Sequence, residues 1–127
     1  MSFVSGSNTA PGAGYAPASG TATMLVWVPA GTGTGSSNAS AQDFGGTGMS
    51  EVTNNDQTSD LAGNGDPSCA PAFLVNPGTT SQTLSLTWAA SRNTEVGYAF
   101  TVDDVDSVSS TSGGTYSSDA SPSLTYS

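Results

Sequence analysis

The chain has 127 residues, the length of one ordinary domain, and 35% of them are hydrophobic. It carries ten acidic residues, a single basic one (Arg92), no Lys and no His, so its formal net charge is −9. This balance argues against nucleic acid or an anionic membrane as a partner, because both are bound through Lys and Arg. It also excludes a Ser-His-Asp triad and a Ser-Lys pair.

The residue types favour strands and turns over helices. The sequence contains 22 Ser, 17 Thr, 16 Gly and 7 Pro, all of which discourage helix formation. Cys69 is the only cysteine, so no intramolecular disulfide can form, and we expect a buried or unreactive thiol. The N-terminus lacks the basic and apolar regions of a secretory signal, and no apolar run is long enough to span a membrane. We therefore expect a protein that is made in the cytosol and stays there or is released by lysis.

The beginning of the chain predicts an arm followed by a strand. In residues 1–20 the few apolar residues are scattered among Gly, Pro, Ala and Ser, which favours an extended N-terminal arm. Residues 21–28 predict the first strand. Its second half is apolar at every position, as is typical of a central strand with both faces covered. Pro29 and the glycines of residues 31–35 are expected to end it.

A hairpin and a loop are predicted next. Residues 39–44 and 48–53 have the composition of two short strands, and Gly45-Gly46 between them can take the positive φ values of a tight turn. Residues 54–68 are polar and contain glycine, so we expect a long loop there.

Two strands joined by a turn follow. Residues 72–75 predict a strand, residues 76–78 (Asn-Pro-Gly) a turn, and residues 81–88 a second strand. In the second strand apolar residues alternate with Ser and Thr, which is the period of a half-buried strand.

Residues 96–102 repeat this alternation. Larger apolar residues occupy every other position and small residues lie between them, so we expect the larger ones to face the core. Further strands are predicted at residues 105–109 and 123–126. The larger residues are Val96, Tyr98, Phe100 and Val102, and the smaller ones are Gly97, Ala99 and Thr101.

Taken together, these patterns predict an all-β fold. Several short strands with turn signals between them, and no helical period, favour a single antiparallel β-sandwich or jelly roll of about seven to eight strands. Residues 1–20 are assigned to an extended N-terminal arm and residues 21–127 to the sandwich domain. The core of so small a domain is modest, so neighbouring subunits are expected to contribute to its stability.

Several short motifs follow one another in a recognisable order. They are Trp27-Val28, Phe44-Gly45-Gly46, Phe73-Leu74-Val75-Asn76-Pro77-Gly78, Thr83-Leu84-Ser85-Leu86-Thr87-Trp88, Ala99-Phe100-Thr101-Val102-Asp103-Asp104-Val105-Asp106 and Ser121-Pro122-Ser123-Leu124-Thr125. This order resembles a broad group of Ser/Thr-rich β-sandwich modules found in phage virion proteins and bacterial exoproteins.

The resemblance covers about residues 21–125 and implies a sandwich used for decoration, fibre building or adhesion, without shared catalytic residues. It implies that the strand containing Phe73-Leu74-Val75 pairs with the alternating strand after it. Such modules commonly continue beyond the Pro-Ser strand, whereas this chain ends at Ser127. Either the N-terminal arm or a strand of a partner subunit would fill that place.

Carboxylates are the remaining candidates for chemistry. Asp103, Asp104 and Asp106 could form a glycosidase acid pair or an oxygen-ligand Ca²⁺ site. Residues 54–66 offer similar ligands, but they do not match the EF-hand spacing. The alternative is a solvated strand end and a surface loop, because Asp is favoured where strands end. We predict this alternative, and hence no catalytic, cofactor-binding or metal-binding residues.

Trp27 and Trp88 are the candidates for stacking on a sugar. Both lie at the ends of apolar strands, where packing in the core is the expected role. A carbohydrate-binding or adhesive module of a cell-surface or extracellular protein, with a glycan as partner, is therefore an alternative to the leading hypothesis.

That leading hypothesis is a non-catalytic structural protein of a tailed-phage virion, either a capsid decoration (cement) subunit or a fibre module. Its partners would be the major capsid protein or other virion proteins, together with copies of itself. It would reside in the virion and need no cofactor, nucleic acid or membrane. Besides the glycan-binding module, the alternatives are a hydrolase that uses the Asp103, Asp104 and Asp106 cluster, and a self-assembling filament subunit.

Overall fold

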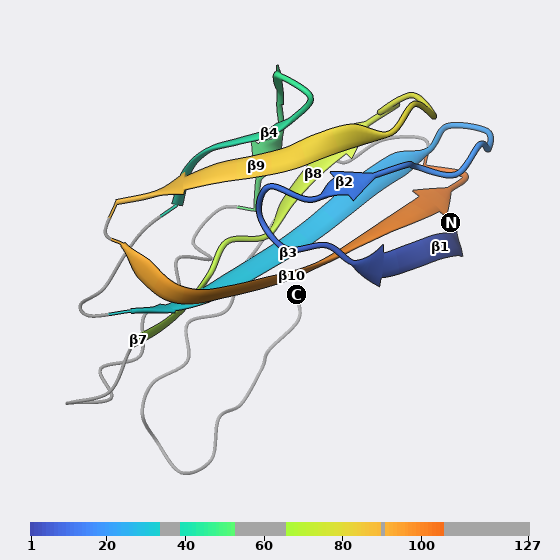
Figure 1. Cartoon of the computed structure of the whole chain (residues 1–127). Coiled ribbons are helices and arrows are strands. Elements are labelled where there is room, and N and C mark those ends of the chain that lie inside the picture. The colour runs from blue at the N-terminus through green and yellow to red at the C-terminus, as the bar shows by residue number, and fades with distance from the viewer. Residues whose placement is uncertain (34–38, 53–65, 90, 106–127) are drawn as a thin grey trace, which may run out of the picture.

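The computed structural model describes residues 1–33, 39–52, 66–89 and 91–105 (Figure 1). Within these ranges the chain forms strands and no helix, and the strands make two antiparallel sheets packed together. The predicted antiparallel β-sandwich is therefore confirmed. The same ranges hold no helix that is long and apolar enough to cross a membrane.

The larger sheet has six strands. Five of them follow the order β1-β10-β3-β8-β6, and β7 pairs with β3 beyond the end of β8. The two longest strands, β3 and β10, lie beside each other in this sheet and carry most of its pairing. The strands are β1 (Ser2–Asn8), β3 (Met24–Gly33), β6 (Ser50–Glu51), β7 (Asp66–Cys69), β8 (Ala72–Val75) and β10 (Arg92–Asp103).

The smaller sheet has four strands in the order β2-β9-β4-β5. In Figure 1 it lies above the larger sheet, so the core forms between the two. Its strands are β2 (Gly14–Tyr15), β4 (Ala39–Phe44), β5 (Thr47–Gly48) and β9 (Gln82–Trp88).

The core comes from the alternating positions of both sheets. On β3 every second residue is buried, because strand side chains point to opposite faces in turn. Burying these large apolar side chains stabilises the fold by about 1.5–3 kcal/mol each. The cluster consists of Tyr15, Leu25, Trp27, Phe44, Leu84 and Ala99, with Met49, Leu74 and Leu86 packed against it.

β3 is central, as predicted, but it does not end at Pro29. It runs through Pro29 to Gly33, and its neighbour changes from β8 to β7 at this point. The Pro29 carbonyl accepts a hydrogen bond from the Ala70 N–H (3.0 Å), so Pro29 turns its backbone nitrogen toward the link between β7 and β8. The ladder is interrupted there, and a proline without an N–H costs little in such a place.

The Gly45-Gly46 turn is confirmed, with φ values of 60° and 84°. The strand after it is shorter than predicted. β5 stops at Gly48, the Met49 N–H donates to the Gln42 carbonyl (2.9 Å), and the chain then crosses to the larger sheet as β6. The predicted strand of residues 48–53 is thus divided between the two sheets.

Part of the predicted loop of residues 54–68 is a strand. Residues 66–68 belong to β7, which pairs with β3. The remainder of that segment, residues 54–65, lies outside the described residues. Pairing with β3 explains this strand, which the polar local sequence did not indicate.

The turn after β8 also differs from the expectation. β8 (residues 72–75) and the turn residues Asn76 and Gly78, with φ values of 53° and 74°, are as predicted. However, β8 pairs with β3 and β6, whereas β9 pairs with β2 and β4. The pairing of these two strands that the resemblance implies is therefore wrong, because residues 76–81 connect the two sheets.

Between Val96 and Thr101, β10 presents the opposite face to the core from the one predicted, whereas Val102 is buried as expected. Ala99 and Thr101 are fully buried, whereas Val96 is 58% exposed and Tyr98 is 42% exposed. The reason lies on the inner side of β10 at Gly97, where a Cβ atom would overlap the Thr9 carbonyl and lie 2.9 Å from the Trp27 indole nitrogen. Only small side chains fit this face of β10, so the larger ones point outward.

The two ends of the chain were predicted to form an extended N-terminal arm and two further strands. The N-terminal segment is extended, and it contributes β1 beside β10 and β2 beside β9. It therefore fills an edge position in each sheet. Of the strand predicted at residues 105–109, only Val105 is described; it is buried and follows the end of β10 without belonging to a strand. The strand predicted at residues 123–126 lies outside the described residues.

Candidate functional site

The two outer faces of the sandwich differ in polarity. On the smaller sheet, Thr83, Ser85 and Thr87 alternate with buried or half-buried leucines and therefore point outward. Asp43 of β4 lies beside them, and its carboxylate accepts hydrogen bonds from the Ser85 hydroxyl (2.6 Å) and the Gly46 N–H (2.9 Å). This outer face is polar and suited to water.

The outer face of the larger sheet is apolar. Leu25, Trp27, Ala72 and Ala99 are fully buried between the sheets, so their strand neighbours point away from the core. We call the resulting surface the apolar outer face. It consists of Phe3, Met24, Val26, Val28, Phe73, Val75, Val96, Tyr98 and Phe100.

The strand register makes this face continuous. Phe100 pairs with Gly6 on one side and with Val26 on the other, and Val26 pairs in turn with Phe73. The row therefore runs from β1 through β10 and β3 to β8. Directly opposite side chains lie about 5 Å apart, so the residues of such a row contact one another.

The exposed large apolar side chains gather on this sheet. Among the described residues there are six of them, and none belongs to the smaller sheet. Contiguous apolar surface of this kind marks interaction sites in soluble proteins. The six are Met1 (77% exposed), Phe3 (64%), Val96 (58%), Tyr98 (42%), Val75 (39%) and Val4 (38%).

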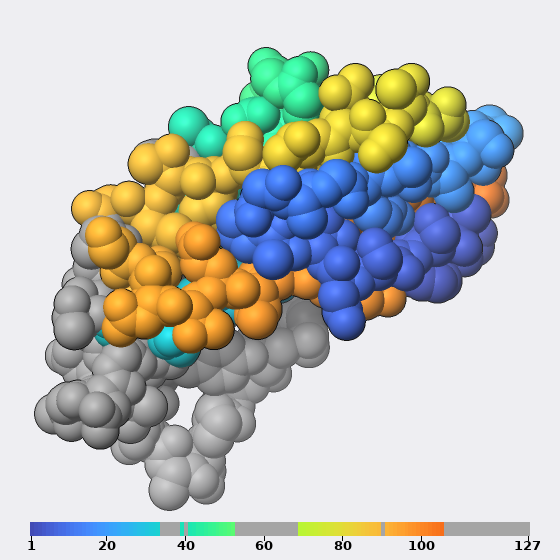
Figure 2. All heavy atoms as spheres, viewed as in Figure 1, coloured from blue at the N-terminus to red at the C-terminus, as the bar shows by residue number. Residues whose placement is uncertain are grey.

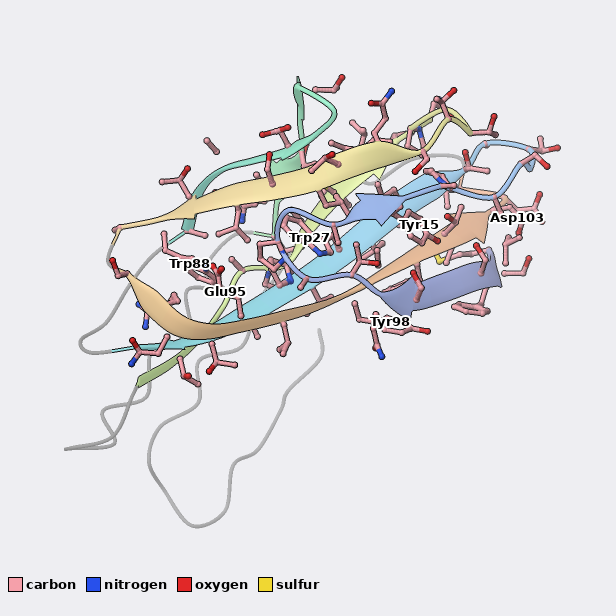
Figure 3. The ribbon with its side chains drawn as sticks, viewed as in Figure 1. Tyr15, Trp27, Trp88, Glu95, Tyr98 and Asp103 are labelled. Atoms are coloured by element: carbon pink, nitrogen blue, oxygen red, sulfur yellow. The ribbon has the colours of Figure 1, made fainter. Side chains whose placement is uncertain are left out.

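Three aromatic rings lie at the β1 side of the face. The ring centres of Phe3 and Phe100 are 6.3 Å apart, as are those of Tyr98 and Phe100, with interplanar angles of 35° and 38°. Gly6 leaves room for Tyr98, because a Cβ atom there would lie 2.7 Å from the Tyr98 hydroxyl. Figure 3 shows Tyr98 on the side of β10 that faces away from the smaller sheet. The tilted rings form an apolar ridge and not one flat sugar platform.

The apolar outer face carries no charge, although the chain has a net charge of −9. The carboxylates of β10 belong to Glu95 and Asp103, which alternate with the outward-facing Val96 and Tyr98 and so lie on the other side of the strand. Depletion of charge at the centre of a surface is a property of protein–protein contacts. The face is therefore suited to binding another protein.

Sequence reasoning did not identify this face. The alternation of residues 96–102 was correct, but it does not say which of the two sets points inward. The available signal was that β3 is apolar on both faces, because a strand with two apolar faces needs apolar partners on both sides.

The two tryptophans are engaged within the fold. Trp27 is fully buried, and its indole N–H donates to the Thr9 carbonyl (2.9 Å), so its predicted core role is confirmed. Trp88 is half-buried. Its indole N–H donates to the Glu95 carboxylate (2.6 Å), and the Arg92 guanidinium lies 5.5 Å from its ring centre (Figure 3). Trp88 thus joins β9 to β10, and neither ring belongs to the apolar outer face.

The acidic candidates are only partly described. β10 ends at Asp103, as predicted, and the Asp103 carboxylate accepts a hydrogen bond from the Ser2 hydroxyl. Asp104 has a φ of 55°, and its N–H donates to the carbonyl of Thr21, just before β3 (2.9 Å). Asp106 and residues 54–65 lie outside the described residues. Across the described part of the chain, no three His, Cys, Asp or Glu side chains come together to hold a metal.

Cys69 is half-buried at the end of β7, and burial raises the pKa of its thiol. The reactive thiolate is therefore scarcer at neutral pH than for a free cysteine, whose pKa is about 8.5. We expect iodoacetamide to alkylate Cys69 several times more slowly in the folded chain than in urea. The rates are measured by mass spectrometry at one pH. Equal rates in both states would contradict this assignment.

Comparison of the chain with protein-family models, curated protein sequences and solved structures gave no match.

Proposed function

We propose that the protein is a non-catalytic structural component of a virus particle, such as a capsid decoration or fibre module of a tailed phage. It docks through the apolar outer face. The observation that carries this proposal is the contrast between an uncharged apolar face on one sheet and a polar face bearing Asp43 on the other. The first suits contact with a protein lattice, and the second keeps the exposed side hydrated.

The residue types of the chain support an assembly role. The sequence has no His and no Lys, which are common proton-transfer and nucleophilic groups in enzymes. What the fold offers is a rigid, twisted pair of sheets with distinct surfaces. The resemblance to phage virion sandwiches suggests the kind of particle, with the major capsid protein or another virion protein as the partner.

Particles purified from the source provide the direct test. If the proposal is right, mass spectrometry detects this chain in them at a fixed stoichiometry, and cryo-electron microscopy shows the sandwich with its larger sheet turned toward the particle. Particles that lack the chain contradict the proposal. A chain attached through the smaller sheet contradicts the assigned face.

The face itself is tested by Tyr98→Asp. A carboxylate at this position would be buried without a partner on docking, which is strongly unfavourable. We expect the variant to bind particles that lack the protein at least ~10-fold more weakly than the wild type. Thr83→Asp adds the same charge to the other outer face and serves as the matched control.

Circular dichroism must show that both variants are folded. If Tyr98→Asp binds as tightly as Thr83→Asp, the apolar outer face is not the docking surface.

A further inference from the structure

The edge strands of the two sheets differ in how well they are protected from pairing. β2, β5 and β6 are two residues long, and β7 contains Asp66-Pro67. Shortness, charge and proline are the usual means by which proteins block an edge. β1 has seven residues, Ser-Phe-Val-Ser-Gly-Ser-Asn, with no charge and no proline, and its register is regular from Ser5 to Asn8, beyond the irregularity between Phe3 and Ser5. It lies at the margin of the molecule in Figure 2.

The backbone groups on the free side of β1 can be identified. The Thr9 N–H donates to the Gly97 carbonyl of β10 (2.8 Å). Because strand backbone groups face alternate sides, those of Ser5 and Ser7 also face β10, and those of Gly6 and Asn8 face away from it. Among the described strands, β1 pairs with β10 alone.

We propose that this edge pairs antiparallel with β1 of a second copy of the chain, joining two larger sheets into one. Around a twofold axis at Ser7, Gly6 of each copy faces Asn8 of the other, and these residues exchange backbone hydrogen bonds. This register uses the regular part of the strand and avoids the irregularity between Phe3 and Ser5.

Each copy carries a net charge of −9, so two copies repel each other except where their contact surfaces are uncharged. β1 is uncharged, so no like charges meet in the pairing. The nearest described carboxylate on β10, Asp103, lies beside Ser2 at one end of β1. The antiparallel register places the two Asp103 side chains roughly 30 Å apart along the strands, well beyond the screening length of about 8 Å at physiological salt.

The pairing also extends the apolar outer face. Phe3 lies on β1 and is 64% exposed, and its ring neighbours Phe100 on β10. Joining the sheets at β1 therefore merges two apolar outer faces into one docking surface of about twice the area. As an assembly contact, the pairing rests on the proposed function.

Sedimentation and light scattering of the full chain over a wide concentration range test the inference. We expect a monomer–dimer equilibrium that tightens as NaCl is raised, because salt screens the repulsion between the acidic copies. Asn8→Pro removes an N–H from the free edge and leaves the β10 ladder intact, so it should weaken the dimer at least ~10-fold.

Glu51→Pro is the matched control. The Val52 N–H donates to the Pro71 carbonyl, so the N–H of Glu51 faces away from β8, at the opposite edge of the sheet as far as the structure describes it. This variant should dimerise like the wild type. Hydrogen exchange on the wild type provides a reading without substitution, because the Gly6 and Asn8 amides should gain protection as concentration rises.

A chain that is monomeric at every concentration overturns the pairing and leaves particle binding untouched. The β1 pairing is also overturned if Asn8→Pro dimerises like the wild type, or if the dimer becomes weaker as NaCl is raised. It is equally overturned if the Gly6 and Asn8 amides gain no protection on dimerisation. Absence of the chain from particles, with the dimer intact, contradicts the proposed function alone.

Discussion

Replacing Trp27 by Ala is expected to lower the free energy of unfolding by about 3–5 kcal/mol. Trp27 is fully buried at the centre of the core cluster, where neighbouring side chains surround it. The substitution removes the largest buried side chain and leaves the buried Thr9 carbonyl without its donor. A domain of this size has about 5–15 kcal/mol of total stability, so the loss is a large part of it.

Denaturant unfolding measures this loss when it is monitored by far-ultraviolet circular dichroism, which reports on the backbone and not on tryptophan fluorescence. Trp27→Phe keeps an aromatic ring but removes the indole N–H and part of the bicyclic ring, so we expect a smaller loss than for Trp27→Ala, with about 1–3 kcal/mol of it due to the unpaired Thr9 carbonyl. Trp88→Ala is the control for removing a tryptophan, because Trp88 is half-buried at the sandwich rim. If Trp27→Ala costs no more than Trp88→Ala, the core is centred elsewhere.

Local patterns were sufficient to predict much of the fold. The apolar run of residues 24–28 indicated a central strand, and β3 is central. The Gly45-Gly46 pair predicted the turn between β4 and β5, because positive φ values are determined by the residues themselves. Such features depend on neighbours in the chain, and for this reason a single sequence reveals them.

The expectations that failed depend on contacts between distant residues. β8 and β9 are separated by a short turn, yet they join different sheets, because β8 pairs with β3 and β9 pairs with β4. β7 forms from an unpromising polar sequence because β3 provides a ladder for it. Pairing across sheets is a tertiary choice that overrides local strand preference.

The candidate site was missed for the same reason. Tyr98 and Phe100 were assigned to the core because large apolar residues are usually buried. Their outward orientation is determined by the space on the inner side of β10, which Trp27 and the Thr9 carbonyl occupy. The β10 part of the apolar outer face is therefore apolar because the inner side of β10 has no room for large side chains.

This crowding makes Gly97→Ala the second substitution with a large expected effect. The added methyl group would overlap the Thr9 carbonyl, a backbone atom that cannot rotate away, and press on the Trp27 indole nitrogen. Relief requires β1 or β3 to shift, which strains the Thr9–Gly97 and Trp27–Thr9 hydrogen bonds. We expect a loss of about 3 kcal/mol in unfolding free energy, at the upper end for overpacking.

Gly48→Ala is the matched control, because nothing lies within 4 Å of a Cβ atom there; its effect should stay within about 0.5 kcal/mol. Hydrogen exchange then distinguishes strain from simple strand weakening. In Gly97→Ala the amides of β1 that face β10 should exchange faster, since Thr9 anchors the end of that strand. If the two variants are equally stable, Thr9 does not lie over Gly97. The explanation for the outward orientation of Val96 and Tyr98 would then be wrong.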